Sequence, residues 1–185
     1  MKLKKVFPLF LYLLGFLVLG INDDGHVSGN TNATPPPFEE ILLEIGYKSV
    51  DVAVNDFEQH FNQELILPLR VPPISFTHYL GRFNDLEGEV NDTLEVKFIS
   101  EHFPNNHFKI DVRPLQHKIP FEKYKSKVFK LKNGNDAIYI ENQRFPVNFL
   151  VFETVHWQYA FGIDRNVSDV VTPEILVQIA DSIDF

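Results

Sequence analysis

The chain has 185 residues, 44% of them hydrophobic and 14% aromatic, with 17 basic side chains against 25 acidic ones and a formal charge of −8. This apolar content is enough for a packed core and excludes a wholly disordered chain. The acidic balance argues against nucleic acid and anionic lipid as partners, because both are negatively charged. The sequence contains no cysteine, which excludes disulfides, thiolate zinc sites and cysteine nucleophiles.

The first 21 residues have the pattern of an export segment. Three lysines among the first five residues precede an apolar run at residues 6–21, and polar and acidic residues follow it. As a helix this run would be about 24 Å long, against about 30 Å for a hydrocarbon core. The basic residues orient the rest of the chain outside the membrane. We therefore predict an exported protein: residues 1–21 are a signal cleaved after Gly20, giving a secreted protein, or a membrane anchor on the outer face of the cytoplasmic membrane.

Residues 22–37, NDDGHVSGNTNATPPP, have the composition of a linker. They are polar and end in three prolines. Such a segment buries too little apolar surface to order itself, and the proline run stiffens its end. We predict that it separates the export segment from a single folded domain at residues 38–185. Only the N-terminal segment is then expected to contact the membrane.

Two helices are predicted at the start of this domain. The first has Pro37 in its first turn, an apolar stripe at helical spacing, and Gly46 as its end. The second begins at Ser49 as N-cap and keeps the helical period to about Asn62. The valines of this second segment also alternate, so a strand is the competing interpretation. We favour the helix.

From residue 65 onward the apolar period changes to two, which indicates strands. Polar residues alternate with apolar ones in these segments, which is typical of an antiparallel sheet with one covered face. Asn133-Gly134 suits a tight hairpin turn. Residues 147–164 are too long for one ordinary strand and are expected to fold back near residues 153–156. The clearest strand patterns lie at residues 94–98, 108–112, 129–131, 137–140 and 157–163.

The C-terminal segment TPEILVQIADSI predicts a last helix. Thr172 suits the N-cap, Pro173 the first turn, and Glu174 the positive end of the helix dipole. An apolar stripe has its natural place against the sheet; it consists of Ile175, Leu176, Ile179 and Ile183. The predicted fold class is therefore α+β, with N-terminal helices, a meandering antiparallel β-sheet, and a C-terminal helix packed on the sheet.

The order of four segments, LILPLRVPPI, FKLKNGNDAIYI, VHWQYAFGID and TPEILVQIADSI, resembles an uncharacterised domain family of Firmicutes. Members of that family are exported or membrane-anchored, and some lie outside the membrane on anti-sigma-factor-like proteins. The likeness spans roughly residues 50–183. It implies export and a sensory or binding role, and it brings no catalytic residues.

Glu101, His102 and His107 are weak candidates for a metal site. They lie in the segment EHFPNNH, which is predicted to be a loop between two strands, and carboxylate and imidazole groups are common metal ligands. No fourth ligand is evident, and this histidine spacing is not a recognised ligand pattern. We therefore expect a solvent-exposed loop in which the three side chains point apart. The remaining histidines are scattered, and no catalytic or cofactor-binding residues are predicted.

Two hypotheses of function follow. We favour a non-catalytic extracytoplasmic binding or sensing module of the bacterial cell envelope, which needs no cofactor. Its partner would be a protein, a peptide or a lipid outside the membrane, and the 18 phenylalanines, mostly core, could also line a groove for it. The alternative is a cell-envelope hydrolase or metal-dependent enzyme whose residues come together only in the fold.

Overall fold

The computed structural model describes three ranges of the chain, residues 38–86, 90–141 and 146–183. The predicted export segment and linker lie outside these described residues. None of the helices in the described ranges is long and apolar enough to cross a membrane.

The chain divides into two compact units, Met1–Gly46 and Tyr47–Phe185. In the first unit the described element is the helix α2, Phe38–Glu44. Gly46 follows it with a φ of 91°. A glycine adopts this left-handed conformation at no steric cost, which is why glycine so often ends a helix.

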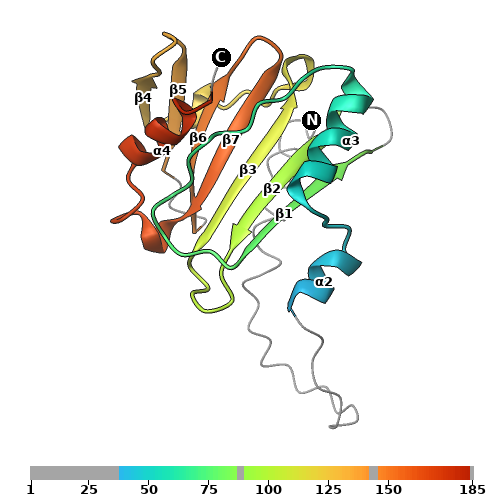
Figure 1. The fold of residues 1–185 in the computed structure, drawn as a ribbon. Helices are drawn as coiled ribbons and strands as arrows, with labels where there is room; N and C mark the ends of the chain where they lie inside the picture. Colours follow the sequence, from blue (N-terminus) through green and yellow to red (C-terminus); the bar gives the residue numbers. More distant parts are fainter. Residues whose placement is uncertain (1–37, 87–89, 142–145, 184–185) are drawn as a thin grey trace, which may run out of the picture. The chain divides into compact units, whose positions relative to one another are not determined.

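The second unit is built on a seven-stranded antiparallel sheet (Figure 1). The strands lie in the order β1-β2-β3-β7-β6-β5-β4, and β3 pairs with β7 at the centre. The predicted α+β class is confirmed, and the meandering sheet consists of two meanders joined at that central pair. The strands are β1 His78–Asn84, β2 Thr93–Ile99, β3 His107–Pro114, β4 Lys127–Lys130, β5 Asp136–Ile140, β6 Val147–Glu153 and β7 Trp157–Asp164.

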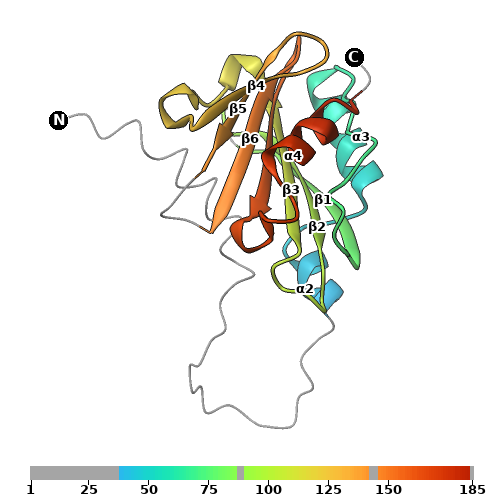
Figure 2. The same cartoon turned by 90° about the vertical axis from the view of Figure 1, so that its left-hand side faces the viewer.

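Two longer helices, α3 (Val50–Phe61) and α4 (Pro173–Ala180), lie on one face of this sheet (Figure 2). The helix predicted over the α3 segment is confirmed, and the competing strand is wrong. Asn62 ends α3 in the left-handed conformation, with a φ of 49°. At α4 the hydroxyl of Thr172 accepts a hydrogen bond from the backbone N–H of Ile175, as expected for an N-cap. Three short 3₁₀ helices complete the described elements: η1 Leu115–His117, η2 Glu122–Tyr124 and η3 Arg165–Val167.

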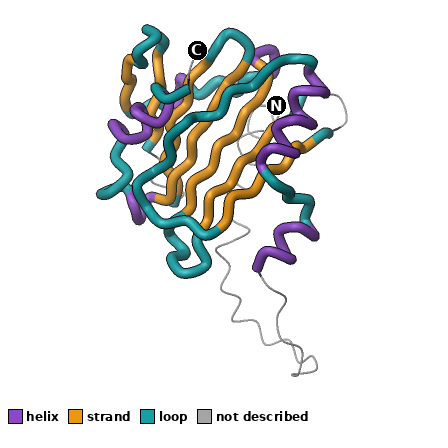
Figure 3. The backbone as a smooth tube through the Cα atoms, in the orientation of Figure 1, coloured by secondary structure: helices purple, strands orange, loops and turns teal. Residues whose placement is uncertain are grey.

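The segment that joins α3 to β1, residues 62–77, crosses the helix-bearing face between α3 and α4 (Figure 3). The sequence predicted strand structure from residue 65, and this prediction is wrong for this segment. Its three prolines cannot donate backbone hydrogen bonds to a neighbouring strand. Side chains of β7 bind it instead: the indole of Trp157 donates to the carbonyl of Glu64, and the hydroxyl of Tyr159 donates to the carbonyl of Ile66, both at 2.9 Å.

Strand β1 is absent from the clearest strand patterns in the sequence, because Gly81 interrupts its alternation. That glycine has a packing role. A Cβ atom at position 81 would lie 2.7 Å from the Cβ of Ala53 in α3, which is closer than two non-bonded carbon atoms approach each other. The helix can therefore lie this close to β1 only because position 81 carries no side chain. The backbone of Gly81 also exchanges two hydrogen bonds with Lys48, at 2.8 and 2.9 Å.

The hairpin between β4 and β5 is longer than the predicted two-residue turn. Gly134 has a φ of 86°, but among the described non-glycine residues a positive φ occurs at Asn62 alone. Asn133 is therefore not left-handed. Its side chain accepts a hydrogen bond from the backbone N–H of Asn135 at 3.0 Å, forming an Asx turn that replaces the tight turn. The predicted fold-back near residues 153–156 is confirmed, since it separates β6 from β7.

The hydrophobic core lies on the helix-bearing face. Alternate strand residues such as Val96, Ile110 and Phe161 point to this face and are buried. Phe57 of α3 and Leu176 of α4 belong to the same cluster. The apolar half of each alternating strand pattern thus forms the core that the sequence indicated.

Candidate functional site

The face of the sheet opposite the core carries charged side chains in the strands β1, β2 and β3. Successive side chains of a strand point to opposite faces. In β1, β2 and β3 the side chains that alternate with the core residues therefore lie on the face opposite the core. The sequence predicted that only one face would be covered, but Lys109 is only 1% exposed and its charged neighbours in β2 and β3 are also buried. Charges can be buried here because opposite signs lie side by side along and across the strands. The charged residues are Arg82, Glu95, Lys97, Lys109, Asp111 and Arg113.

The carboxylate of Glu95 is the shared partner of three of these charges. Its Oε1 lies 3.3 Å from Nζ of Lys97 and 3.5 Å from Nη2 of Arg82, and its Oε2 lies 3.2 Å from Nζ of Lys109. The same Nζ of Lys109 lies 3.0 Å from Oδ2 of Asp111. One carboxylate thus faces three cations, and a second carboxylate shares one of them.

Tyr47 completes this cluster. Its hydroxyl donates a hydrogen bond to Glu95. Its ring receives the guanidinium of Arg82 at 4.6 Å from the centroid and the ammonium of Lys97 at 4.8 Å. Such cation–π contacts add to the ion pairs when they are removed from water. We refer to the six residues Tyr47, Arg82, Glu95, Lys97, Lys109 and Asp111 as the Glu95 network.

Burial opposes the charged form of both lysines of the network, but the neighbouring carboxylates offset it to different extents. Burial lowers the pKa of Lys97, and the neighbouring Glu95 only partly offsets it. Burial also lowers the pKa of Lys109, but Asp111 and Glu95 together outweigh it, so the pKa is raised overall. The two carboxylates therefore hold Lys109 in its charged form although it is buried.

The structure does not bring the three predicted metal-ligand candidates together. Glu101 and His102 are exposed in the turn after β2, and Glu101 lies 3.9 Å from the imidazole of His78. His107 was expected in the same exposed loop, but it is the first residue of β3 and is only 6% exposed. Its place in the alternation puts its side chain on the buried charged face with Lys109.

His107 predicts a specific dependence of stability on pH. Burial, with the nearby charges of Lys97 and Lys109, lowers its pKa to about 3. In the unfolded chain a histidine takes up its proton near pH 6.5. Between these values the unfolded chain binds more protons than the folded one, so stability falls as the pH falls. We expect His107→Gln to reduce this slope by up to about 1.4 kcal/mol per pH unit in urea titrations. Parallel profiles for the two chains would contradict the assignment.

A cavity of about 450 Å³ lies beside β5, β6 and β7, against the connection that contains η1 and η2. Apolar side chains form part of its wall: Phe121, Ile138 and Val151. Charged side chains also line it: Lys118, Glu122, Asp136 and Glu153. The volume falls within the usual range for small-molecule sites, although polar and charged side chains form a larger part of this lining than is usual for such sites.

The side chain of Gln158 fixes one wall of this cavity. Its amide accepts a hydrogen bond from the backbone N–H of Ile119 at 2.8 Å and donates one to the carbonyl of the same residue at 2.9 Å. Nearby, Nζ of Lys118 lies 3.0 and 2.9 Å from the two carboxylate oxygens of Glu153. The hydrogen bond to Glu153 raises the pKa of Lys118. These contacts hold the connection against β6 and β7, so this wall is formed before any ligand binds.

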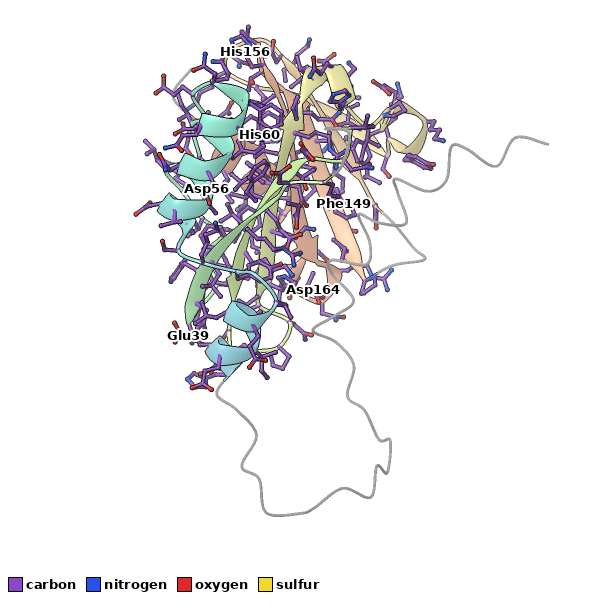
Figure 4. The ribbon with its side chains drawn as sticks, turned by 90° about the vertical axis from the view of Figure 1, so that its right-hand side faces the viewer. Glu39, Asp56, His60, Phe149, His156 and Asp164 are labelled. Carbon is purple, nitrogen blue, oxygen red and sulfur yellow. The ribbon has the colours of Figure 1, made fainter. Side chains whose placement is uncertain are left out.

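A second group of polar side chains lies at one end of α3. His60 is in the last turn of α3, Asp85 follows β1 directly, and Asp92 directly precedes β2. One potential ligand atom from each of the three lies within 4.8 Å of the others. Within the described ranges, these are the three histidine or acidic side chains whose spacing could hold a metal ion. Figure 4 shows His60 projecting from α3, and its ring packs against Phe83 of β1 at 5.1 Å.

Sequence reasoning missed both the cavity and this group. The two aspartates flank one connection between strands, and this proximity in the sequence was the available signal. His60 joins them only because α3 packs on β1, which no local pattern specifies. The cavity is lined by residues from four separate segments, so it too has no sequence signature.

Comparisons with models of known protein families, with curated proteins and with solved structures find no match to this chain. The resemblance to the Firmicutes family therefore stays a prediction.

Proposed function

We propose that this chain is a non-catalytic binding or sensing module of the bacterial cell envelope, located outside the cytoplasmic membrane. The observation that supports binding is the cavity of about 450 Å³ with its apolar wall and charged lining. Export is supported by the three lysines and the apolar run at the start of the sequence.

The charges around the cavity suggest the chemistry of the ligand. Three carboxylates line it, from Glu122, Asp136 and Glu153, against the single ammonium of Lys118. Glu153 is paired with Lys118, and Asp136 lies 2.7 Å from Lys130 outside the lining. The lining as a whole remains acidic, so it favours a ligand with a cationic group and an apolar portion. An amine on a peptide or on another small molecule of the envelope has this chemistry.

We also propose that α3 and α4 are integral parts of this module, packed on the sheet as its second layer. The burial of Phe57 and Leu176 in one cluster with strand residues supports this arrangement. The sheet would then have its helices on one side and the ligand cavity on the other, because Ile138, Val151 and Gln158 belong to the face opposite the core.

The proposed location predicts the behaviour of a topology reporter. Alkaline phosphatase, fused after Phe185, should be active, because it folds only outside the cytoplasm. A cytoplasmic reporter such as β-galactosidase, fused at the same position, should be inactive. Removing the apolar run at residues 6–21 is the matched control and should abolish phosphatase activity. Activity of the β-galactosidase fusion alone would contradict the export proposal.

The proposed ligand chemistry predicts selective stabilisation by an amine. We expect 2-phenylethylamine to raise the melting temperature of the full-length chain at pH 7, and phenylacetate, which has an anionic group instead, to have no effect. Ile138→Trp should abolish the stabilisation, because the indole fills part of the cavity. Val155→Trp is the control, since Val155 is 82% exposed in the turn between β6 and β7. Equal loss of stabilisation in both variants would show that the amine binds elsewhere.

A further inference from the structure

The carboxylate of Asp92 is unusual because it is buried without a full set of hydrogen bonds. Its side chain has no solvent exposure. Oδ1 accepts a hydrogen bond from the backbone N–H of Leu86 at 2.7 Å, whereas Oδ2 is buried and no donor in the described part of the chain forms a hydrogen bond with it. A buried carboxylate oxygen in this state is costly unless a charge or a donor is supplied.

An imidazole nitrogen lies close to this oxygen. Nε2 of His60 is 3.2 Å from Oδ2 of Asp92, which is ion-pair distance, but the two atoms do not form a hydrogen bond. Ligand atoms about 2.0–2.2 Å from a zinc ion in a tetrahedral site lie about 3.3–3.6 Å from each other. The observed separation of 3.2 Å is close to this range, so the two atoms are near the spacing of neighbouring ligands of one ion.

A third potential ligand is present, and neighbouring residues orient the side chains of His60 and Asp92. A carboxylate oxygen of Asp85 lies within 4.8 Å of one potential ligand atom of His60 and one of Asp92, and Asp85 is exposed, which leaves a route for an ion to enter. The ring of His60 is held between Phe61 at 4.6 Å and Phe83 at 5.1 Å. The hydrogen bond from Leu86 fixes the other oxygen of Asp92. Contacts of this kind orient the ligands of known metal sites.

We propose that His60, Asp85 and Asp92 bind a divalent transition-metal ion, with Zn²⁺ as the preferred ion. An imidazole nitrogen with two carboxylates suits Zn²⁺, whereas Ca²⁺ and Mg²⁺ prefer ligands that are all oxygen. The ion would connect the end of α3 to both ends of the β1–β2 connection. It lies on the helix-bearing side of the sheet and is independent of the proposed ligand cavity.

The test uses the purified full-length chain without a histidine tag, first stripped with a chelator. Titration calorimetry should show one Zn²⁺ per chain, with Ca²⁺ binding much more weakly, and Zn²⁺ should raise the melting temperature. Asp85→Asn and His60→Gln should each weaken Zn²⁺ binding by at least about tenfold, because even changes in the surrounding shell cost 10- to 100-fold. Asp85 is exposed, so its variant is expected to keep the fold of the parent chain.

The matched controls are Glu101→Gln and His102→Gln, which remove an acid and a histidine from the exposed turn after β2. Both should bind Zn²⁺ as tightly as the unmodified chain. Any one of three results would overturn the proposal. These are no Zn²⁺ binding by the unmodified chain, undiminished Zn²⁺ binding in Asp85→Asn and His60→Gln, or a loss of Zn²⁺ binding in the control variants alone.

Discussion

Replacing Glu95 with glutamine should lower the free energy of unfolding by about 3–5 kcal/mol, the range typical when one partner of a buried ion pair is removed. The carboxylate of Glu95 faces Arg82, Lys97 and Lys109 within 3.5 Å, and glutamine has nearly the same shape but no charge. The buried cations would then repel one another without their central counter-charge. Urea denaturation at pH 7, followed by circular dichroism, measures the change.

The matched control is a carboxylate that pairs with a lysine at the surface. Asp136 lies 2.7 Å from Nζ of Lys130, but both side chains are more than half exposed. Asp136→Asn should change the free energy of unfolding by less than about 1 kcal/mol, because exposed ion pairs contribute little. If Glu95→Gln and Asp136→Asn had equal effects, the Glu95 network would not be buried in solution as it is in the structure.

The Glu95 network also marks where sequence reasoning failed. Alternation of Glu95, Lys97 and Lys109 with apolar residues correctly predicted strands β2 and β3, since the period of two follows from the geometry of the strand. The same alternation suggested that the polar face meets solvent. Burial of that face depends on what covers it, and the period of a strand carries no information about this.

The helices were better predicted, because their signals are local. Ser49 and Asn62 mark the ends of α3, and Thr172 with Pro173 marks the start of α4. The connection before β1 was misassigned because two of its backbone carbonyls accept hydrogen bonds from the side chains of Trp157 and Tyr159, each 93 residues away from its partner in the sequence. The contact of α3 with Gly81 is likewise non-local, as is the contact of His60 with Phe83 near the two aspartates.

The candidate sites share this non-local origin. The sequence singled out Glu101, His102 and His107 because they are close along the chain. In the structure His107 is buried as the first residue of β3, whereas Glu101 and His102 are exposed in the turn after β2. His60 and Asp92, which are 32 residues apart, approach within 3.2 Å. Proximity along the chain was therefore a poor guide to proximity of functional groups in this fold.

The second large effect concerns α4. Leu176→Ala should lower the free energy of unfolding by about 2–5 kcal/mol, the usual range when a buried leucine is cut back to alanine. The side chain of Leu176 has no solvent exposure and belongs to the core cluster with strand residues such as Leu150. Since a domain of this size is stable by only about 5–15 kcal/mol, this loss is a large fraction of the total. Urea denaturation measures it.

Gln178→Ala is the matched control, because Gln178 is exposed on the same helix and alanine favours helix formation. Its effect should stay within about 0.5 kcal/mol.

Deleting residues 172–185 should have a larger effect than Leu176→Ala and abolish cooperative unfolding. It removes the core side chains of α4 together with Asp181, whose carboxylate accepts a hydrogen bond from the backbone N–H of Lys132 at 2.7 Å. It also removes Ser182, whose carbonyl accepts from the backbone N–H of Leu69 at 3.4 Å. If the shortened chain melted cooperatively at the original temperature, α4 would be an appendage and the proposed two-layer module would be wrong.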